Sequence, residues 1–233
     1  MKIEIWSDFV CPFCYIGKRR LEQAIERFPE EIEVELHYKS FQLDPNAPTY
    51  NGESIHAALA KKYNMSVERA KQMNQQVGDQ AKSVGLEFVF DTMKPTNTFH
   101  THRLSKFAKS AGKESEFVDE MLYQYFTLSA DLSDRETLIT ICGKLGLDKE
   151  KVKQVLDDDK MFADEVYTDQ DEAQKLGITG VPFFVFNGKY AISGAQPIET
   201  FMNALEKIVE DMREPLQDIS HKKGSFCDGD NCN

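Results

Sequence analysis

Polar and apolar side chains alternate in two stretches near the start of the chain. The first is 2–6, which opens with charged residues alternating with isoleucine, and the second is 32–39, where four apolar residues alternate with four polar ones. A period of two predicts β-strands with one face on the core. Between them, apolar residues at three- and four-residue spacing over 21–28 predict an amphipathic helix that ends at Pro29. Two strands joined by a helix are most simply parallel neighbours with a right-handed crossover.

A long region of helical periodicity follows the turn-rich segment 44–48. The helices that it predicts cover 54–63, 66–84, 97–111, 114–126, 134–145 and 148–157. Glycines are expected to end three helices, and short polar residues are expected to cap three helix N-termini. These residues are Gly85, Gly112 and Gly146, and Asn97, Ser133 and Asp148, respectively.

The chain returns to strand patterns after one more predicted helix at 161–176. The apolar run 183–186 predicts a buried strand, and Asn187-Gly188 is typical of a two-residue hairpin turn that leads to a partner strand at 189–193. Pro182 cannot donate a backbone hydrogen bond, so it is expected at the start of the first strand.

The last helix is predicted to open at Pro197. It carries apolar residues at helical spacing, namely Ile198, Phe201, Met202, Leu205, Ile208 and Met212. After Pro215 the chain is polar, and we expect a flexible tail.

Charge and composition narrow the range of partners. The 233 residues include 39 acidic and 28 basic side chains, which gives a net charge of -11. This charge repels phosphate backbones and anionic membrane surfaces, so neither nucleic acid nor a membrane is an expected partner. No apolar run is long enough to span a bilayer, and the chain opens in a strand pattern without an apolar signal core. We therefore expect a cytoplasmic protein.

The most informative motif is Cys11-Pro12-Phe13-Cys14, which lies between the first strand and the first helix. A thiol is nucleophilic as the thiolate, and the positive end of a helix dipole stabilises the thiolate. Cys11 would lie at that end, and Cys14 could attack a mixed disulfide formed on Cys11. The alternative interpretation is half of a zinc site, which would need Cys227, Cys232 or His221 as further ligands. The strand-to-helix position favours redox chemistry, and we expect no metal site.

Three other groups of residues were weighed for chemistry. Cys227 and Cys232 could form a second redox pair, or they could be idle thiols of the tail, and both interpretations stay open. Cys142 shares a predicted helix face with apolar residues, so a buried and inert thiol is expected. His100 and His102 are two positions apart on a helix and cannot share a ligand. Asp8 could either relay protons or cap the helix.

The order strand, C-x-x-C helix, strand, helices, Gly-Val-Pro, hairpin and helix resembles the thioredoxin fold of the DsbA family, and its cytosolic FrnE-like subgroup in particular. The residues that carry the resemblance are Ser7-Asp8-Phe9-Val10-Cys11-Pro12-Phe13-Cys14, Phe41-Gln42-Leu43, Asn97-Thr98, His102-Arg103-Leu104 and Gly180-Val181-Pro182-Phe183-Phe184. The resemblance implies an α/β thioredoxin fold with a large all-helical insertion domain. Its parts would be a thioredoxin-like domain at 1–48 and 160–214, a helical insertion at 49–159, and a tail at 215–233 with a C-x4-C motif.

The resemblance also implies roles for individual residues. Pro182 would follow a cis peptide bond beside the Cys11/Cys14 pair, and the backbone of Val181 would hold an extended substrate. Phe13 would offer an apolar docking surface. From the family pattern, Asn97 and His102 would line the cleft that faces Cys11.

The activity implied is thiol–disulfide exchange with protein or small-thiol substrates. No tightly bound cofactor is expected, because the redox-active disulfide carries the electrons, and glutathione or another low-molecular-weight thiol is a compatible partner. The alternative is a glutathione-dependent isomerase or transferase acting on small aromatic or polyketide-like compounds, since the chain also resembles 2-hydroxychromene-2-carboxylate isomerase and kappa-class glutathione transferase. Those proteins typically have serine where this chain has Cys11. Retention of both cysteines favours dithiol exchange.

Overall fold

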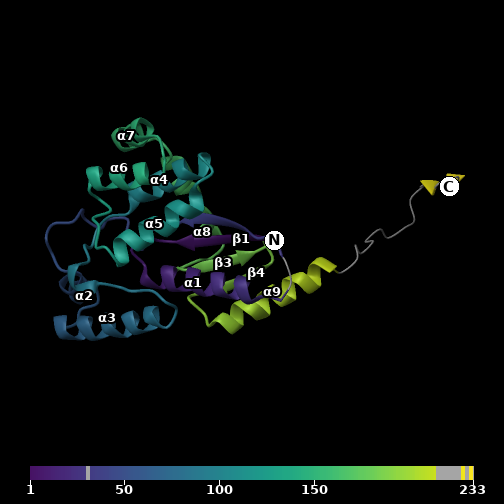
Figure 1. Ribbon diagram of the computed structural model, residues 1–233, viewed down its shortest axis with the longest axis horizontal. Helices are drawn as coiled ribbons and strands as arrows, with labels where there is room; N and C mark the ends of the chain where they lie inside the picture. Colours follow the sequence, from purple (N-terminus) through teal and green to yellow (C-terminus); the bar gives the residue numbers. More distant parts are fainter. Residues whose placement is uncertain (30–31, 214–226, 229–230, 233) are drawn as a thin grey trace.

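A four-stranded mixed sheet forms the centre of the computed structural model, which describes residues 1–29, 32–213, 227–228 and 231–232. The strands are β1 (Lys2–Ser7), β2 (Glu35–Ser40), β3 (Phe183–Phe186) and β4 (Tyr190–Ser193), in the order β2-β1-β3-β4. β1 and β2 are parallel, as the strand–helix–strand pattern predicts. β3 and β4 form an antiparallel hairpin that pairs with the other edge of β1. Residues 2–40 and 183–193, which are far apart in the sequence, thereby build one sheet (Figure 1).

Helices cover both faces of this sheet (Figure 1). α1 (Pro12–Arg27) and α9 (Ile198–Arg213) pack against each other on the face that carries Ile5 and Phe184. There the ring centroids of Phe184 and Phe201 are 5.0 Å apart. α8 (Ala163–Lys175) covers the opposite face, where the Trp6 indole donates to the Asp169 carbonyl at 3.0 Å. Successive side chains of β1 therefore point to opposite faces of the sheet, one covered by α1 and α9 and the other by α8.

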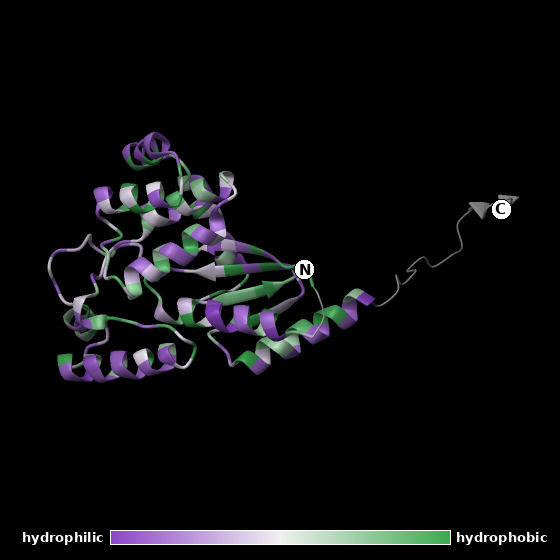
Figure 2. Ribbon diagram, in the orientation of Figure 1, coloured by the Kyte–Doolittle hydropathy of each residue, from purple (hydrophilic) through white to green (hydrophobic). Residues whose placement is uncertain are grey.

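The segment between β2 and α8 is helical, as predicted. Its elements are α2 (Ile55–Lys62), α3 (Val67–Lys82), the 3₁₀ turn η1 (Phe90–Thr92), α4 (Phe99–Ser110), α5 (Glu114–Phe126), α6 (Arg135–Lys144) and α7 (Lys149–Asp157). α4 lies at the centre of this segment and contacts α5, α7 and α8. In Figure 2, α3 and α7 are mostly hydrophilic, whereas β3 is hydrophobic along its length.

Helix ends agree with the predictions at most positions. The three glycines predicted to end helices have φ of 82°, 69° and 73°, which glycine adopts without a steric penalty. Asp148 caps α7, since its carboxylate accepts from the backbone N–H of Glu150 and Lys151. The prediction for Ser133 was wrong, because Asp134 caps α6 and accepts from the N–H of Thr137.

Three further predictions shift slightly. β2 begins at Glu35 rather than at residue 32, and α4 has Thr98 at its N-cap, one position after Asn97. The Asn97 side chain nevertheless accepts from the N–H of Phe99 at 2.9 Å. Met212 was assigned to the apolar face of the last helix, but it is 62% exposed. The reason is visible in Figure 1, where the last turns of α9 extend beyond the sheet.

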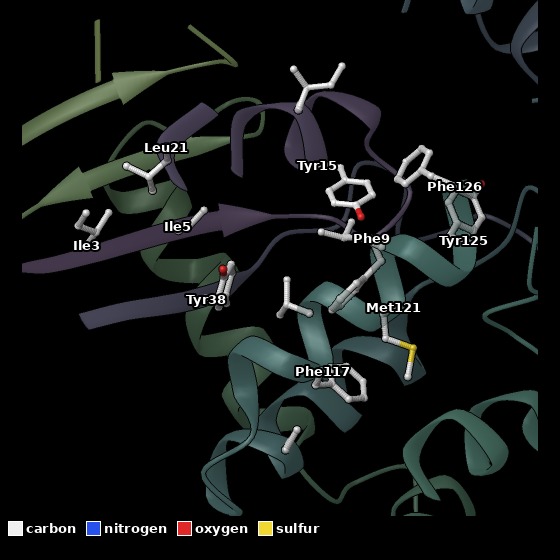
Figure 3. Packing of buried hydrophobic residues seen from close by; sticks show 14 of the residues in the cluster. Ile3, Ile5, Phe9, Tyr15, Leu21, Tyr38, Phe117, Met121, Tyr125 and Phe126 are labelled. Carbon is white, nitrogen blue, oxygen red and sulfur yellow. The ribbon is translucent and has the colours of Figure 1, made fainter. Parts of the chain in front are cut away.

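One hydrophobic cluster joins the sheet with the helical segment. Figure 3 shows Ile5 of β1 and Tyr15 of α1 in the same core as Phe117 and Phe126 of α5. The helices between β2 and α8 therefore do not form a separate core but complete that of the sheet.

The tail lies largely outside the described residues. Within it, the structure describes the short antiparallel pair β5 (Cys227–Asp228) and β6 (Asn231–Cys232), in which Cys227 is opposite Cys232. The prediction that the tail is flexible falls mainly on residues that the structure does not describe, so it stays a prediction. In the described part of the chain, no helix has the length and apolar character needed to cross a membrane.

Candidate active site

The dithiol lies where the sequence places it, at the start of α1. Cys11 is the N-cap residue, with extended backbone torsions (φ -91°, ψ 112°), and Pro12 is the first helical residue. The first turn contains no acidic side chain, so the positive end of the helix dipole faces Cys11 without compensation. The backbone N–H of Cys14 donates to the Cys11 carbonyl at 3.0 Å, which brings the two residues one turn apart on the same side.

The two thiols are both reduced and both buried, but they differ in their surroundings. The Cys11 sulfur donates to the Val181 carbonyl at 3.6 Å, and the residue is 4% exposed. Cys14 is 2% exposed, and burial raises the pKa of its thiol well above the ordinary value. A hydrogen bond with Cys11 raises this pKa further, while the Ser7 hydroxyl and the Asp8 backbone N–H act in the opposite direction. Cys14 is therefore held as a thiol until something removes its proton.

β3 approaches the dithiol through a cis peptide bond between Val181 and Pro182. The approach requires a glycine in α1. A Cβ added to Gly17 would lie 3.0 Å from Pro182 Cγ and 3.2 Å from Phe184 Cζ. Both distances are shorter than an ordinary carbon–carbon contact of about 3.5–4.0 Å. Gly17 thus allows the start of β3 to lie against α1 next to the cysteines.

Exposed apolar side chains lie close to the dithiol. Phe13 is 38% exposed and Leu43 is 42% exposed. The segment of Leu43 is fastened to the residues that precede Cys11, since Leu43 N–H donates to the Asp8 carboxylate at 2.8 Å and Phe41 N–H donates to the Ser7 carbonyl at 3.1 Å. The docking role predicted for Phe13 therefore has an exposed apolar side chain available to it.

Asp8 is 1% exposed and makes no cap to α1, so the capping interpretation of this residue was wrong. One carboxylate oxygen accepts from Leu43 N–H, and the other lies 3.3 Å from Nε2 of His102. His102 is itself 3% exposed, and the ring of Phe9 covers it at a centroid distance of 4.9 Å. The structure thus joins two residues that sequence analysis had considered separately.

The predicted cleft-lining residues have different positions. His102 is internal, paired with Asp8. The Asn97 amide donates to the carbonyls of Pro45 and Ala47 at 3.1 and 3.0 Å, so it fastens the loop after β2 to α4.

Cys142 is completely buried on α6, as expected, and burial raises the pKa of its thiol to about 12. Within the described residues, no three His, Cys, Asp or Glu side chains are grouped as a metal ion would require.

A small cavity lies between the ends of β1 and β2 and the helices α4 and α5. Its polar lining residues are Ser7, Tyr38, Lys39, Ser40, His102, Ser105 and Lys106. Its volume is about 10 Å³. This is close to the smallest space that holds one water molecule, given polar partners.

Beside this cavity is a buried ion pair that sequence analysis missed. Lys106 of α4 pairs with Asp169 of α8 and also donates to the Tyr38 carbonyl at 3.0 Å. Asp169 accepts from the N–H of Ser40 at 2.8 Å. A signal was present, because Asp169 falls on the same helix face as the apolar Val166 and Ala173. A charged residue in an apolar stripe indicates a buried partner.

Comparison with known proteins defines the family. Residues 2–206 match the family model of the DSBA-like thioredoxin domain. The chain belongs to this family. Among solved structures, this DSBA-like protein is similar to a probable DsbA oxidoreductase from Streptomyces coelicolor, with 38% identity, a TM-score of 0.88, and coverage of 100% of this chain and 98% of the other.

Two more distant structures share the fold of this DSBA-like chain. A 2-hydroxychromene-2-carboxylate isomerase has 15% identity and a TM-score of 0.70, with 91% of this chain and 98% of the isomerase covered. The cytosolic disulfide reductase DsbM from Pseudomonas aeruginosa has 14% identity and a TM-score of 0.58, with 90% of this chain and 99% of DsbM covered. At these identities the likeness concerns the fold only, and the two proteins carry out different chemistry on it.

Proposed function

We propose that this DSBA-like protein is a thiol–disulfide oxidoreductase that exchanges disulfides with protein or small-thiol substrates through Cys11 and Cys14. The observation that carries the proposal is the arrangement of the dithiol. Cys11 lies at the uncompensated N-terminus of α1, and the buried Cys14 is hydrogen-bonded to it. A helix N-terminus stabilises negative charge, which suits Cys11 to be the attacking sulfur, while burial raises the pKa of Cys14 and keeps it protonated until it is needed.

The proposed cycle has two displacements. The Cys11 thiolate attacks one sulfur of a substrate disulfide, so that a mixed disulfide forms and the other substrate thiolate leaves. The Cys14 thiolate then attacks the Cys11 sulfur, which forms the Cys11–Cys14 disulfide and releases the second substrate thiol. The substrate gains two electrons and the dithiol loses them. The backbone of Val181 would hold the substrate chain, and Phe13 with Leu43 would contact its apolar residues.

A low-molecular-weight thiol could return the protein to its reduced form. Two glutathione molecules would be oxidised to one disulfide for each Cys11–Cys14 bond reduced. The support for this partner is indirect, since DsbM has been crystallised with glutathione. DsbM is described as cytosolic, and we propose the same compartment for this protein.

The test compares single cysteine variants in reduction of insulin or glutathione disulfide. We expect Cys11→Ser to abolish turnover and Cys14→Ser to accumulate a mixed disulfide with substrate, visible by mass spectrometry. Cys142→Ala is the matched control, because this thiol is buried elsewhere and should leave turnover unchanged. Full activity in Cys11→Ser would refute the proposal.

The isomerase alternative needs a pocket beside Cys11 that can take an aromatic substrate. The cavity of about 10 Å³ described above has neither cysteine in its lining, and pockets for small organic ligands are about 300–1,000 Å³. The presence of both Cys11 and Cys14 supports disulfide exchange, since two thiols are needed to form and resolve the mixed disulfide. An isomerase that used only Cys11 would keep its turnover in Cys14→Ser, so the same variants separate the two functions.

A further inference from the structure

Cys14 must lose a proton before it can attack the mixed disulfide on Cys11. Its side chain is almost entirely removed from solvent, at 2% exposed. Burial also raises the pKa of this thiol, so the proton leaves less readily than from an exposed cysteine. At neutral pH, hydroxide in bulk water is too dilute to remove it quickly. If the proposed dithiol exchange is correct, the proton has to leave through neighbouring protein groups.

Ser7 connects the Cys14 sulfur with the small cavity described above. Its hydroxyl lowers the pKa of the Cys14 thiol and so acts on the sulfur at close range, and the same residue lines the cavity. A hydroxyl both donates and accepts, so it can pass a proton onward. The cavity has space for about one water molecule between polar groups, and such a water would extend the chain of hydrogen bonds. His102 lines the same cavity.

The Asp8 carboxylate determines how the His102 ring is protonated. The carboxylate lies 3.3 Å from Nε2, so the neutral imidazole carries its hydrogen there and keeps the Nδ1 lone pair free to accept a proton. Neither residue is more than 3% exposed, and in such surroundings opposite charges attract strongly.

We propose that His102, oriented by Asp8, accepts the proton of Cys14 through Ser7 and a water in the cavity. The Cys14 proton moves to Nδ1 of His102, which leaves a Cys14 thiolate and an imidazolium paired with Asp8. The thiolate attacks the Cys11 sulfur, the Cys11–Cys14 bond forms, the bond to the substrate breaks, and the substrate leaves as a thiolate. In the opposite direction, the imidazolium returns the proton to Cys14.

The other titratable groups near this pair are less suited to accept the proton. They are Tyr38 and Lys39 of β2, Lys106 of α4, Tyr125 of α5 and Asp169 of α8. The Lys106 ammonium has no lone pair, and it is held by Asp169 and by the Tyr38 carbonyl. Lys39 pairs with Asp169 and Glu172, which raise the pKa of its ammonium despite the opposing effect of burial. Burial raises the pKa of both Tyr38 and Tyr125, which stay neutral.

The experiment follows the two displacements separately. Reduced full-length protein in excess is mixed rapidly with 5,5′-dithiobis(2-nitrobenzoate), and release of the coloured thiolate is recorded. The protein carries Cys227→Ser and Cys232→Ser, so that the thiols of the tail cannot release the coloured thiolate. The first release then reports attack by Cys11, and the second reports resolution by Cys14. The second phase must disappear in Cys14→Ser. If it persists, the proposed dithiol function fails, whatever the role of His102.

The test variant is His102→Gln, because glutamine can still donate to Asp8 but cannot take up a proton at neutral pH. We expect the second phase to slow at least about 10-fold near pH 7, while the first phase changes less than about twofold. The difference from wild type should shrink between about pH 7 and about pH 9, because hydroxide then removes the proton without His102.

A matched control is available in His56→Gln. His56 is a second buried histidine, 6% exposed, that is hydrogen-bonded to Asp91 at 3.1 Å but belongs to α2. This variant should leave both phases unchanged. Ser7→Ala is a second test that removes only a hydroxyl, and it should also slow the second phase selectively.

Three outcomes would overturn the proposal. One is a second phase in His102→Gln within twofold of wild type. Another is a slowing that is equal in both phases or independent of pH, which would indicate a structural role. The third applies if His102→Gln fails to fold, as seen by circular dichroism, because Ser7→Ala then decides alone and an unchanged second phase refutes the route.

Discussion

Gly17 offers a direct measurement of how tightly β3 lies against α1 beside the dithiol. In Gly17→Ala the new methyl group would be 3.0 Å from Pro182 Cγ, 3.2 Å from Phe184 Cζ and 3.4 Å from Ala195 Cα. All three distances are below the optimum of about 3.5–4.0 Å for carbon atoms. Two of the three neighbouring atoms are in a proline ring or the backbone, so they cannot move aside as the end of a flexible side chain would.

The expected free-energy change combines two opposing effects. Replacing glycine by alanine inside a helix stabilises it by about 1 kcal/mol. Forcing an extra carbon into a packed site costs about 1–3 kcal/mol. Gly78 of α3 isolates the first effect, because a Cβ there would have only Phe90 Cε2 nearby, at an ordinary 3.7 Å. We therefore expect Gly78→Ala to stabilise the protein and Gly17→Ala to be less stable than Gly78→Ala by about 1–3 kcal/mol.

The assay is urea unfolding of both variants, with thermal melting as a second measure. For a chain of this size each kcal/mol corresponds to about 2–4 °C in Tm. Disulfide reduction should also fall in Gly17→Ala but not in Gly78→Ala, since Pro182 has to move relative to Cys11. If Gly17→Ala were stabilised as much as Gly78→Ala, the argument that α1 and β3 require a glycine here would be refuted.

Two further predictions concern groups outside the dithiol. Burial raises the pKa of the Cys142 thiol to about 12, so only roughly one molecule in 10⁴ is ionised near pH 8. Iodoacetamide should therefore label this residue only after unfolding. Rapid labelling of the native protein, seen by mass spectrometry, would contradict its burial. Hydrogen bonds from the Thr137 hydroxyl and N–H lower the pKa of Asp134, the N-cap residue of α6. The ionised cap therefore stabilises the fold at pH values above the ordinary pKa of an aspartate, and this stabilisation is lost as the pH falls below about 4. Asp134→Ala should therefore cost about 1 kcal/mol at pH 7 in urea unfolding and much less near pH 3, and an equal cost at both values would refute the cap.

Local patterns were sufficient for the elements that bracket the site. The alternation in 2–6 and the Asn187-Gly188 turn each predict structure from neighbouring residues alone, and both positions of the turn have positive φ, at 48° and 67°. Asp148 was recognised as a cap for the same reason. Ser133 was not, because two adjacent residues could each cap α6 and only the packed structure distinguishes them.

The partners of buried polar residues could not be predicted in this way. Lys106 and Asp169 each lie on a buried helix face, and a periodic pattern shows that such a residue is buried but not which other residue meets it. The pairing depends on α4 and α8 crossing near β2, which is a property of the whole fold. The same holds for Asn97, which was expected near the dithiol but holds the loop after β2.

The sequence by itself determined the position of the C-x-x-C pair, the helix that carries it, and the strand that follows Pro182 much later in the chain. Those features are encoded in short segments with definite spacing. Only the tertiary structure decided that Cys14 is sealed from solvent, that Asp8 pairs with His102, and that Ser7 and His102 line the same cavity. The physical reason is that burial and the distances between charges arise when distant segments pack together, and these two quantities control where a proton can go.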